Sequence, residues 1–173
     1  RMIENIREYI PSLSLLGTAL GSQMISGRVN VGMLYPIAAE TESYTGRDSD
    51  HSVFEFVDDT FYTRTDDRVG GAQDDEDTQQ MKYKVQYLIP GTRFAHRMEL
   101  TGATEVERAC LGHAFSLFAE SPHVGGQQAV GHGRVGYEYD DGGLPDPAPY
   151  VEYIRDNRDE IREFVEDLDE QTR

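Results

Sequence analysis

The clearest helical periodicity in the chain lies between Thr104 and Phe118. Apolar residues recur there at helical intervals: Val106, Cys110, Ala114 and Leu117. This spacing places them on one face of a helix. Thr104 with Glu107 three residues later is the pattern of a capping box. The sequence therefore predicts a helix that starts after Thr104, packs its apolar face against a sheet and ends at Pro122.

Two other segments have apolar residues at helical spacing. Residues 2–10 form a short amphipathic run that ends at Pro11. Near the end of the chain, apolar residues form a stripe on a charged segment: Val151, Ile154, Ile161, Val165 and Leu168. This pattern predicts one C-terminal helix over residues 150–173, preceded by a linker rich in Pro and Gly at 141–149.

Alternating apolar and polar residues predict short strands at 28–34, 82–89 and 93–100. A Pro-Gly pair separates the last two segments, so we expect them to form a hairpin. A further strand is expected over 134–139. Separate helices and strands of this kind indicate an α+β fold.

Residues 37–80 differ from the rest because long polar runs flank a short aromatic segment. This composition predicts an inserted hairpin or lobe, with residues 1–36 and 81–140 forming the core. The run Asp74–Asp77 inside it is interpreted as a solvated acidic loop rather than a metal site.

The stretch 121–136, SPHVGGQQAVGHGRVG, follows the helix predicted after Thr104. Five of its sixteen residues are glycine. Glycine tolerates positive φ and lets a backbone approach a ligand closely, and successive amides in such a turn can bind an anion. The residues leave two interpretations open, a simple connection or a loop that holds a nucleic-acid backbone. A second stretch, residues 12–36, is also punctuated by glycine and leads into a strand.

The net charge of -16 is unusual, with 32 acidic residues against 16 basic ones. Lysine occurs only at Lys82 and Lys84. An acidic balance argues against nucleic acid, because phosphate binding needs Lys and Arg. However, acid spread over the whole chain with little lysine is typical of halophile proteins. At an ionic strength of 1 M the Debye length is only about 3 Å, so general repulsion would be screened.

Little in the chain points to enzymatic chemistry. Cys110 is the single cysteine, which excludes an internal disulfide framework, and its place on an apolar helix face favours burial. The five histidines lack zinc spacing, and no nucleotide or hydrolase motif is present. His96 or His132 as a general acid or base is the catalytic alternative. We expect no catalytic residue, no metal and no cofactor, in a cytoplasmic protein without a membrane span.

Two blocks of sequence resemble a known family. IPGTRFAHRMELTGATEVERACLGHAF followed by SPHVGGQQAVGHGRV resembles the RAMP superfamily of CRISPR proteins, in which a ferredoxin-like (RRM-like) fold carries a glycine-rich loop before its last strand. LSLLGTALGSQMISGRVNVGMLYP looks like the backbone branch, the seventh Cas family, in its type IV form.

This resemblance implies a backbone subunit that binds CRISPR RNA (crRNA) and stacks head to tail with copies of itself. Other effector subunits and a target nucleic acid, read through the guide, would be further partners. The insertion 37–80 would be the family's thumb-like hairpin. The resemblance places RNA-binding residues in the glycine-rich loop: Gly125, Gly126, Gln127, Gly131, His132, Gly133 and Arg134. A second set lies in the other glycine-punctuated stretch: Ser22, Gln23, Ser26 and Arg28. Arg93 and Arg97 would contact phosphate on the sheet.

The sequence departs from the family in two respects: no strand is expected before its first helix, and the lysines that line the family's RNA groove are nearly absent. Two alternatives therefore stay open. The first is a metal-dependent RNA-cleaving subunit using an aspartate of the insertion: Asp48, Asp50, Asp58 or Asp59. The second is an acidic interaction protein with a ferredoxin-like fold that binds no nucleic acid.

Overall fold

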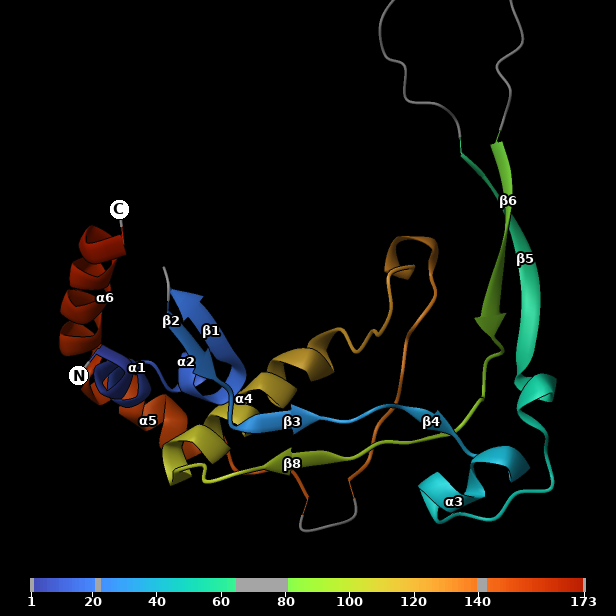
Figure 1. The fold of residues 1–173 in the computed structure, drawn as a ribbon, viewed down its shortest axis with the longest axis horizontal. Coiled ribbons are helices and arrows are strands. Elements are labelled where there is room, and N and C mark those ends of the chain that lie inside the picture. Colours follow the sequence, from blue (N-terminus) through green and yellow to red (C-terminus); the bar gives the residue numbers. More distant parts are fainter. Residues whose placement is uncertain (1, 21–22, 65–80, 140–142, 173) are drawn as a thin grey trace, which may run out of the picture. The chain divides into compact units, whose positions relative to one another are not determined.

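The computed structural model describes residues 2–20, 23–64, 81–139 and 143–172, and it has an α+β fold (Figure 1). The chain divides into two compact units. The first joins Arg1–Val31 to Met98–Arg173, and the second is Gly32–Arg97. Residues 81–97, which the sequence-based boundaries assign to the core, therefore belong to the second unit. No helix in the described ranges is long and apolar enough to cross a membrane.

The first unit contains most of the helices. Its elements in chain order are α1 Met2–Tyr9, α2 Pro11–Leu16, β1 Gly17–Leu20, β2 Gln23–Ser26, β3 Val29–Val31, β8 Met98–Leu100, α4 Glu105–Glu120, the 3₁₀ turn η3 Gln128–Val130, α5 Ala148–Asp156 and α6 Arg158–Thr172.

The second unit is built around one long antiparallel ribbon. Its elements are β4 Tyr35–Pro36, the 3₁₀ turn η1 Ala39–Thr41, α3 Glu42–Thr45, the 3₁₀ turn η2 Val53–Phe56, β5 Val57–Arg64, β6 Met81–Leu88 and β7 Phe94–Ala95. Strand β5 lies within the expected insertion 37–80, but its partner β6 lies after it, in residues that were expected to belong to the core.

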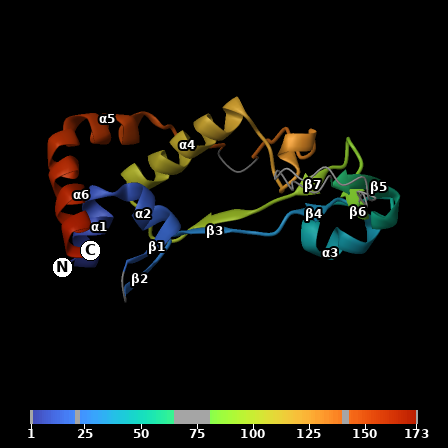
Figure 2. The same ribbon diagram turned by 90° about the horizontal axis from the view of Figure 1, so that it is seen from above.

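Helix α4 begins as its sequence predicts. The Glu107 amide donates to Thr104 Oγ1 at 3.2 Å, and the Thr104 amide donates to Glu107 Oε2 at 2.7 Å. These two reciprocal bonds form the capping box. Cys110 is buried on this helix, as expected. The prediction that a sheet covers the helix is wrong, because α4 packs mainly against α2 and α5 (Figure 2).

The N-terminal segment contains more structure than its sequence suggests. Pro11 ends α1 but also opens α2, since proline fits the first turn of a helix. The first part of the glycine-punctuated stretch 12–36 forms α2 and the β1–β2 hairpin. Gly17 and Gly27 lie where two backbone segments approach closely and leave no room for a side chain. A Cβ on Gly17 would lie 2.7 Å from the Gly27 amide nitrogen, and one on Gly27 would lie 2.7 Å from the Leu16 carbonyl.

The predicted hairpin of residues 82–89 with 93–100 is wrong. Strand β6 pairs with β5, from Val57↔Leu88 to Arg64↔Met81. The Pro-Gly turn after β6 leads the chain into β7, which pairs with β4, and then into β8, which pairs with β3. The strand expected at 28–34 is shorter, Val29–Val31. Alternation identified β3, β6 and the segment of β7 and β8, but it contains no information on which distant strand is the partner.

Two predicted elements near the C-terminus also differ. The single helix expected over 150–173 is divided at Asn157, whose amide nitrogen and Nδ2 donate to Tyr153 O at 3.0 and 2.9 Å and cap α5. Helix α6 then packs on α1, where the rings of Tyr9 and Phe164 stack with centroids 5.0 Å apart. In place of a strand at 134–139 there is one isolated bridge, His123↔Arg134. Each sheet in the described part of the chain has two strands, so the ferredoxin-like arrangement stays a prediction.

A close backbone approach in the first unit gives a test of this packing. A Cβ on Gly112 of α4 would lie 2.0 Å from the Pro145 carbonyl oxygen. We expect Gly112→Ala to lower the free energy of unfolding by about 1–3 kcal/mol, because the segment before α5 must move away from the helix. Urea unfolding followed by circular dichroism measures the change. Gly136→Ala is the matched control, since nothing lies within 4 Å of its Cβ position, and an equal loss in both variants would contradict the packing.

Candidate nucleic-acid interface

The glycine-rich loop after α4 folds back on itself as a narrow hairpin (Figure 1). The Val124 amide donates to Gly133 O at 2.8 Å, and the Val135 amide donates to Pro122 O at 2.9 Å. The turn η3 closes the far end of the hairpin. The loop therefore has a hydrogen-bonded stem, residues 122–124 and 133–135, and a tip, residues 125–132.

The glycines of this loop have two different roles. Gly133 has φ of 86° and a Cβ on it would lie 2.0 Å from Val124 O, so glycine is required there for the stem. At the tip, Gly125 and Gly131 also have positive φ, but no atom lies within 4 Å of a Cβ on Gly125, Gly126 or Gly131. The tip is open to a ligand, whereas Gly133 is a structural residue.

Three amides of the tip donate to carbonyls within the tip itself. The Val130 and His132 amides both donate to Gln127 O at 3.2 Å, and the Gly131 amide donates to Gln128 O at 2.9 Å. The amides of residues 125–127 have no backbone acceptor in the described part of the chain. An anion would therefore bind to the amides in the first part of the tip, Gly125, Gly126 and Gln127. The amides of Gly131 and His132, in its last part, already have acceptors.

The stem is attached to the C-terminal half of α4 by an aromatic cluster. Its four rings are Phe115, Phe118, Tyr137 and Tyr139. The centroid of Phe115 lies 5.4 Å from that of Tyr137 and 5.5 Å from that of Tyr139, and Tyr137 Oη donates to Phe115 O at 3.2 Å. The alternating tyrosines after the loop are visible in the sequence, but their function as its anchor was not predicted. Arg134 is exposed and His132 is half-buried, so both predicted cations of the loop are accessible.

The second predicted set of RNA-binding residues lies in and after the β1–β2 hairpin. Gln23 and Ser26 are exposed, whereas Ser22 lies outside the described residues. Arg7, which sequence reasoning did not select, donates through Nη2 to Ser26 O at 3.1 Å. Arg28 is committed to the protein: its Nη1 lies 2.8 Å from Glu107 Oε2 and also donates to Gly102 O.

The partner of Arg28 is a buried carboxylate. The Glu107 side chain is only 2% exposed. Burial raises the pKa of this carboxyl, but the nearby Ser14 hydroxyl, the hydrogen bonds with Thr104 and the Arg28 charge together lower it by more, so the net result is a lowered pKa. Glu107 is therefore ionised at neutral pH and holds Arg28 against the start of α4.

The two predicted sets in the first unit do not form one pocket. The β1–β2 hairpin follows α2, which packs on α4, whereas the loop follows the C-terminal end of α4 (Figure 1). A helix of 16 residues is about 24 Å long, so a bound chain would have to extend along α4 to meet both. Arg93 and Arg97 are exposed in the second unit.

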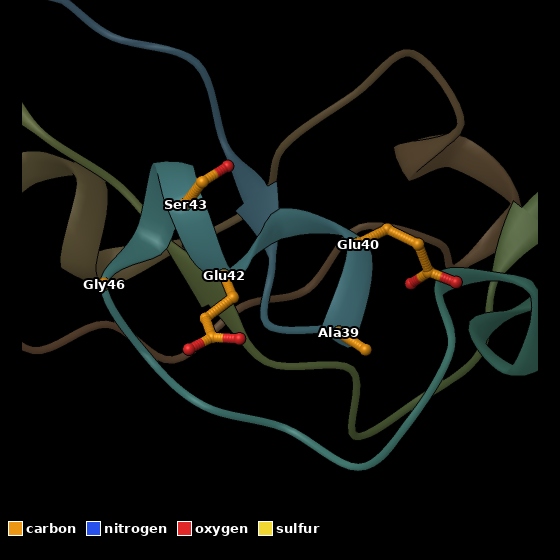
Figure 3. Close-up of a pocket in the computed structure, with 5 residues that line it drawn as sticks. All are labelled: Ala39, Glu40, Glu42, Ser43 and Gly46. Carbon is orange, nitrogen blue, oxygen red and sulfur yellow. The ribbon is translucent and has the colours of Figure 1, made fainter.

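Two surface hollows in the described part of the chain are lined by residues other than the predicted site residues. One of about 420 Å³ lies in the second unit between Ala39 and Gly46 (Figure 3). Its Glu40 and Glu42 carboxylates point away from each other. Glu40 accepts from Ser52 Oγ at 2.5 Å and the Val53 amide at 2.9 Å, and these bonds lower its pKa. Among the described residues no group of three or more metal-ligand side chains converges.

Comparison with known proteins finds similarity among solved structures. No protein-family model and no curated protein matches the sequence. Among solved structures, a chain of a "Type IV-B CRISPR Complex" is similar, with a TM-score of 0.57 and 25% sequence identity. The chain resembles a CRISPR-complex subunit. The match covers 75% of this chain and 51% of the other, so this chain spans about half the length of its structural neighbour.

The Glu107–Arg28 pair predicts a pH-dependent stability. We expect Glu107→Gln to lower the free energy of unfolding at pH 7 by about 2–4 kcal/mol, because it breaks a buried ion pair. A lowered carboxyl pKa stabilises the fold above the unfolded value of about 4.3, and this contribution is lost as pH falls through the folded pKa. The deficit of the variant should therefore shrink below about pH 4.

Urea unfolding at several pH values measures this deficit. Glu105→Gln is the control, since Glu105 is exposed in the same first turn of α4. A deficit for Glu107→Gln that does not change with pH would contradict the ionised state of the buried carboxyl.

Proposed function

We propose that this chain is a non-enzymatic, RNA-binding backbone subunit of a multi-subunit CRISPR effector complex. The observation that carries the proposal is the structural similarity over 75% of the chain to a chain of a type IV-B CRISPR complex. The glycine-rich loop, with its open tip and its unused amides at residues 125–127, supports contact with a phosphate backbone.

The finer parts of the proposal follow from the family resemblance. The core would be a ferredoxin-like RAMP fold, and copies would stack head to tail along a crRNA beside other effector subunits. Sequence would be read by pairing of the guide with its target, while the protein holds the backbone. The acidic composition, with a net charge of -16, supports a cytoplasmic protein of a halophile.

The proposed subunit does not cleave RNA. The two aspartates at the start of β5 have local partners: Asp59 pairs with Lys84, and Asp58 accepts from Tyr87 Oη at 3.1 Å. A cleaving subunit would lose activity when these side chains are removed. Incubating the assembled complex with target RNA and Mg²⁺ or Mn²⁺ should leave the RNA intact, and cleavage abolished by Asp58→Ala or Asp59→Ala would favour the metal-dependent alternative.

The central test is the recovery of bound RNA. We expect the protein, expressed with its neighbouring genes and purified in high salt, to retain RNA of defined length whose sequence contains CRISPR repeat and spacer. Sequencing of the extracted RNA and size-exclusion chromatography measure this. A strict monomer that retains no RNA would contradict the proposal and favour an interaction protein.

The loop tip gives a residue-level test. Gly126→Asp places a carboxylate where the structure has open space, so the fold should persist while repulsion from phosphate lowers RNA affinity by roughly tenfold. Gly126→Ala is the matched control and should bind as the native protein does. Fluorescence anisotropy with labelled crRNA measures both affinities. Equal affinities would show that the tip does not contact RNA.

A further inference from the structure

The two lysines of the chain lie on one face of one strand. The protein has 32 acidic residues and only two lysines, Lys82 and Lys84. Both lie in β6 of the second unit. Because side chains alternate along a strand, residues two apart project to the same side, about 6.7 Å from one another. The scarcest cationic residue of the sequence is therefore concentrated at a single place on the β5–β6 ribbon.

An exposed aromatic ring lies beside these lysines. The register pairs Phe61 of β5 directly with Lys84, so the two side chains share a face of the ribbon. Phe61 is 69% exposed, and the Lys84 side chain is 55% exposed. We call Phe61, Lys82 and Lys84 the lysine face. The opposite face carries three tyrosines, Tyr62, Tyr83 and Tyr87, of which Tyr62 and Tyr87 are half-buried.

We propose that the lysine face binds single-stranded RNA, with a base stacked on Phe61 and phosphates on the two ammonium groups. This inference rests on the proposed function and identifies where the second unit would contact nucleic acid. An aromatic ring flanked by cations is the combination that single-strand binders use, because every base can stack and every phosphate can pair. If only acidic side chains surrounded Phe61, no cation would be present to bind the phosphates of a base stacked on its ring.

One carboxylate opposes this binding and provides a test of it. Asp59 Oδ2 lies 2.5 Å from Lys84 Nζ on the same face. An exposed pair of this kind contributes little stability, but a phosphate must compete with Asp59 for Lys84. Removing that carboxylate should strengthen RNA binding. The neighbouring Asp58 projects to the tyrosine face, where it accepts from Tyr87 Oη, so Asp58→Asn makes the same charge change on the other side of the ribbon.

The experiment measures the affinity of the full chain for RNA by fluorescence anisotropy. The probe is a labelled mixed-sequence single strand of about 30 nucleotides, long enough for several contacts, in about 0.1 M and about 1 M KCl. We expect Lys82→Gln with Lys84→Gln to weaken binding about tenfold in the lower salt and to reduce the logarithmic salt slope by about 1.4, for two phosphates. Arg158→Gln with Arg162→Gln changes the charge equally on α6 and should alter affinity less than about twofold.

Two further variants separate stacking from charge. Phe61→Ala should weaken binding by roughly 5- to 100-fold in both salts, because stacking on a ring is not screened. Asp59→Asn should strengthen binding about two- to fivefold, and Asp58→Asn should have a smaller effect. Circular dichroism checks that each variant keeps its fold, which the exposure of these side chains favours.

The outcomes distinguish the inference from the function on which it rests. Loss of affinity in the lysine and Phe61 variants, but not in the α6 control, supports the lysine face. If these variants bind RNA as the native chain does, the lysine face is wrong and the proposed function stands. If the native chain binds no RNA, both fail. A polyglutamate peptide that binds equally well, without dependence on Phe61, would show a general anion site and overturn the assignment to RNA.

Discussion

The first unit depends on a single buried carboxylate. Glu107 closes the capping box of α4 and pairs with Arg28, and the Ser14 hydroxyl of α2 helps to lower its pKa. One side chain thus connects the start of α4, the helix α2 and the segment that leads into β3. Glu107 Oε2 accepts from both the Thr104 amide and Arg28, and without these partners the buried charge would cost several kcal/mol of free energy. The position of α4 is therefore fixed by the need of Glu107 for its partners as well as by apolar burial.

The glycine-rich loop receives its position from the same helix. Its stem is held by Phe115 and Phe118 on one side and by the tyrosines that follow the loop on the other. Because α4 is fixed at its first turn by Glu107 and at its last turns by these rings, the loop extends from a rigid support. The aromatic cluster holds the stem in place, so the tip can remain open without contacts of its own to the rest of the protein. A loop of this kind presents a pre-organised set of amides, which reduces the entropy lost when a ligand binds.

The sequence predicts features that depend on residues close together in the chain. It does not predict features that depend on contacts between residues far apart in the chain. Thr104 and Glu107 lie three residues apart, so the start of α4 follows from local spacing alone. The partner of β6 cannot be predicted from local spacing, because alternation would allow pairing with either β5 or the strands after the Pro-Gly turn. In the candidate site, Gly126 and Gly133 look alike in the sequence. Only the 2.0 Å approach to Val124 O separates the structural glycine from the accessible one. Arg28 was predicted from its position to contact RNA, yet its guanidinium is bound to a carboxylate 79 residues away.

Net charge and local charge act over different distances, which reconciles an acidic protein with RNA binding. In molar salt the Debye length is about 3 Å, so scattered surface carboxylates hardly repel a phosphate that lies beyond the first contact shell. Ring stacking on Phe61 would not be screened, whereas phosphate contacts at the lysine face would weaken with salt but act at contact distance. A chain of this composition therefore needs few cations, provided that they are grouped with an aromatic ring. The β5–β6 ribbon has that grouping, with Lys82 and Lys84 beside Phe61, although the chain as a whole is strongly acidic.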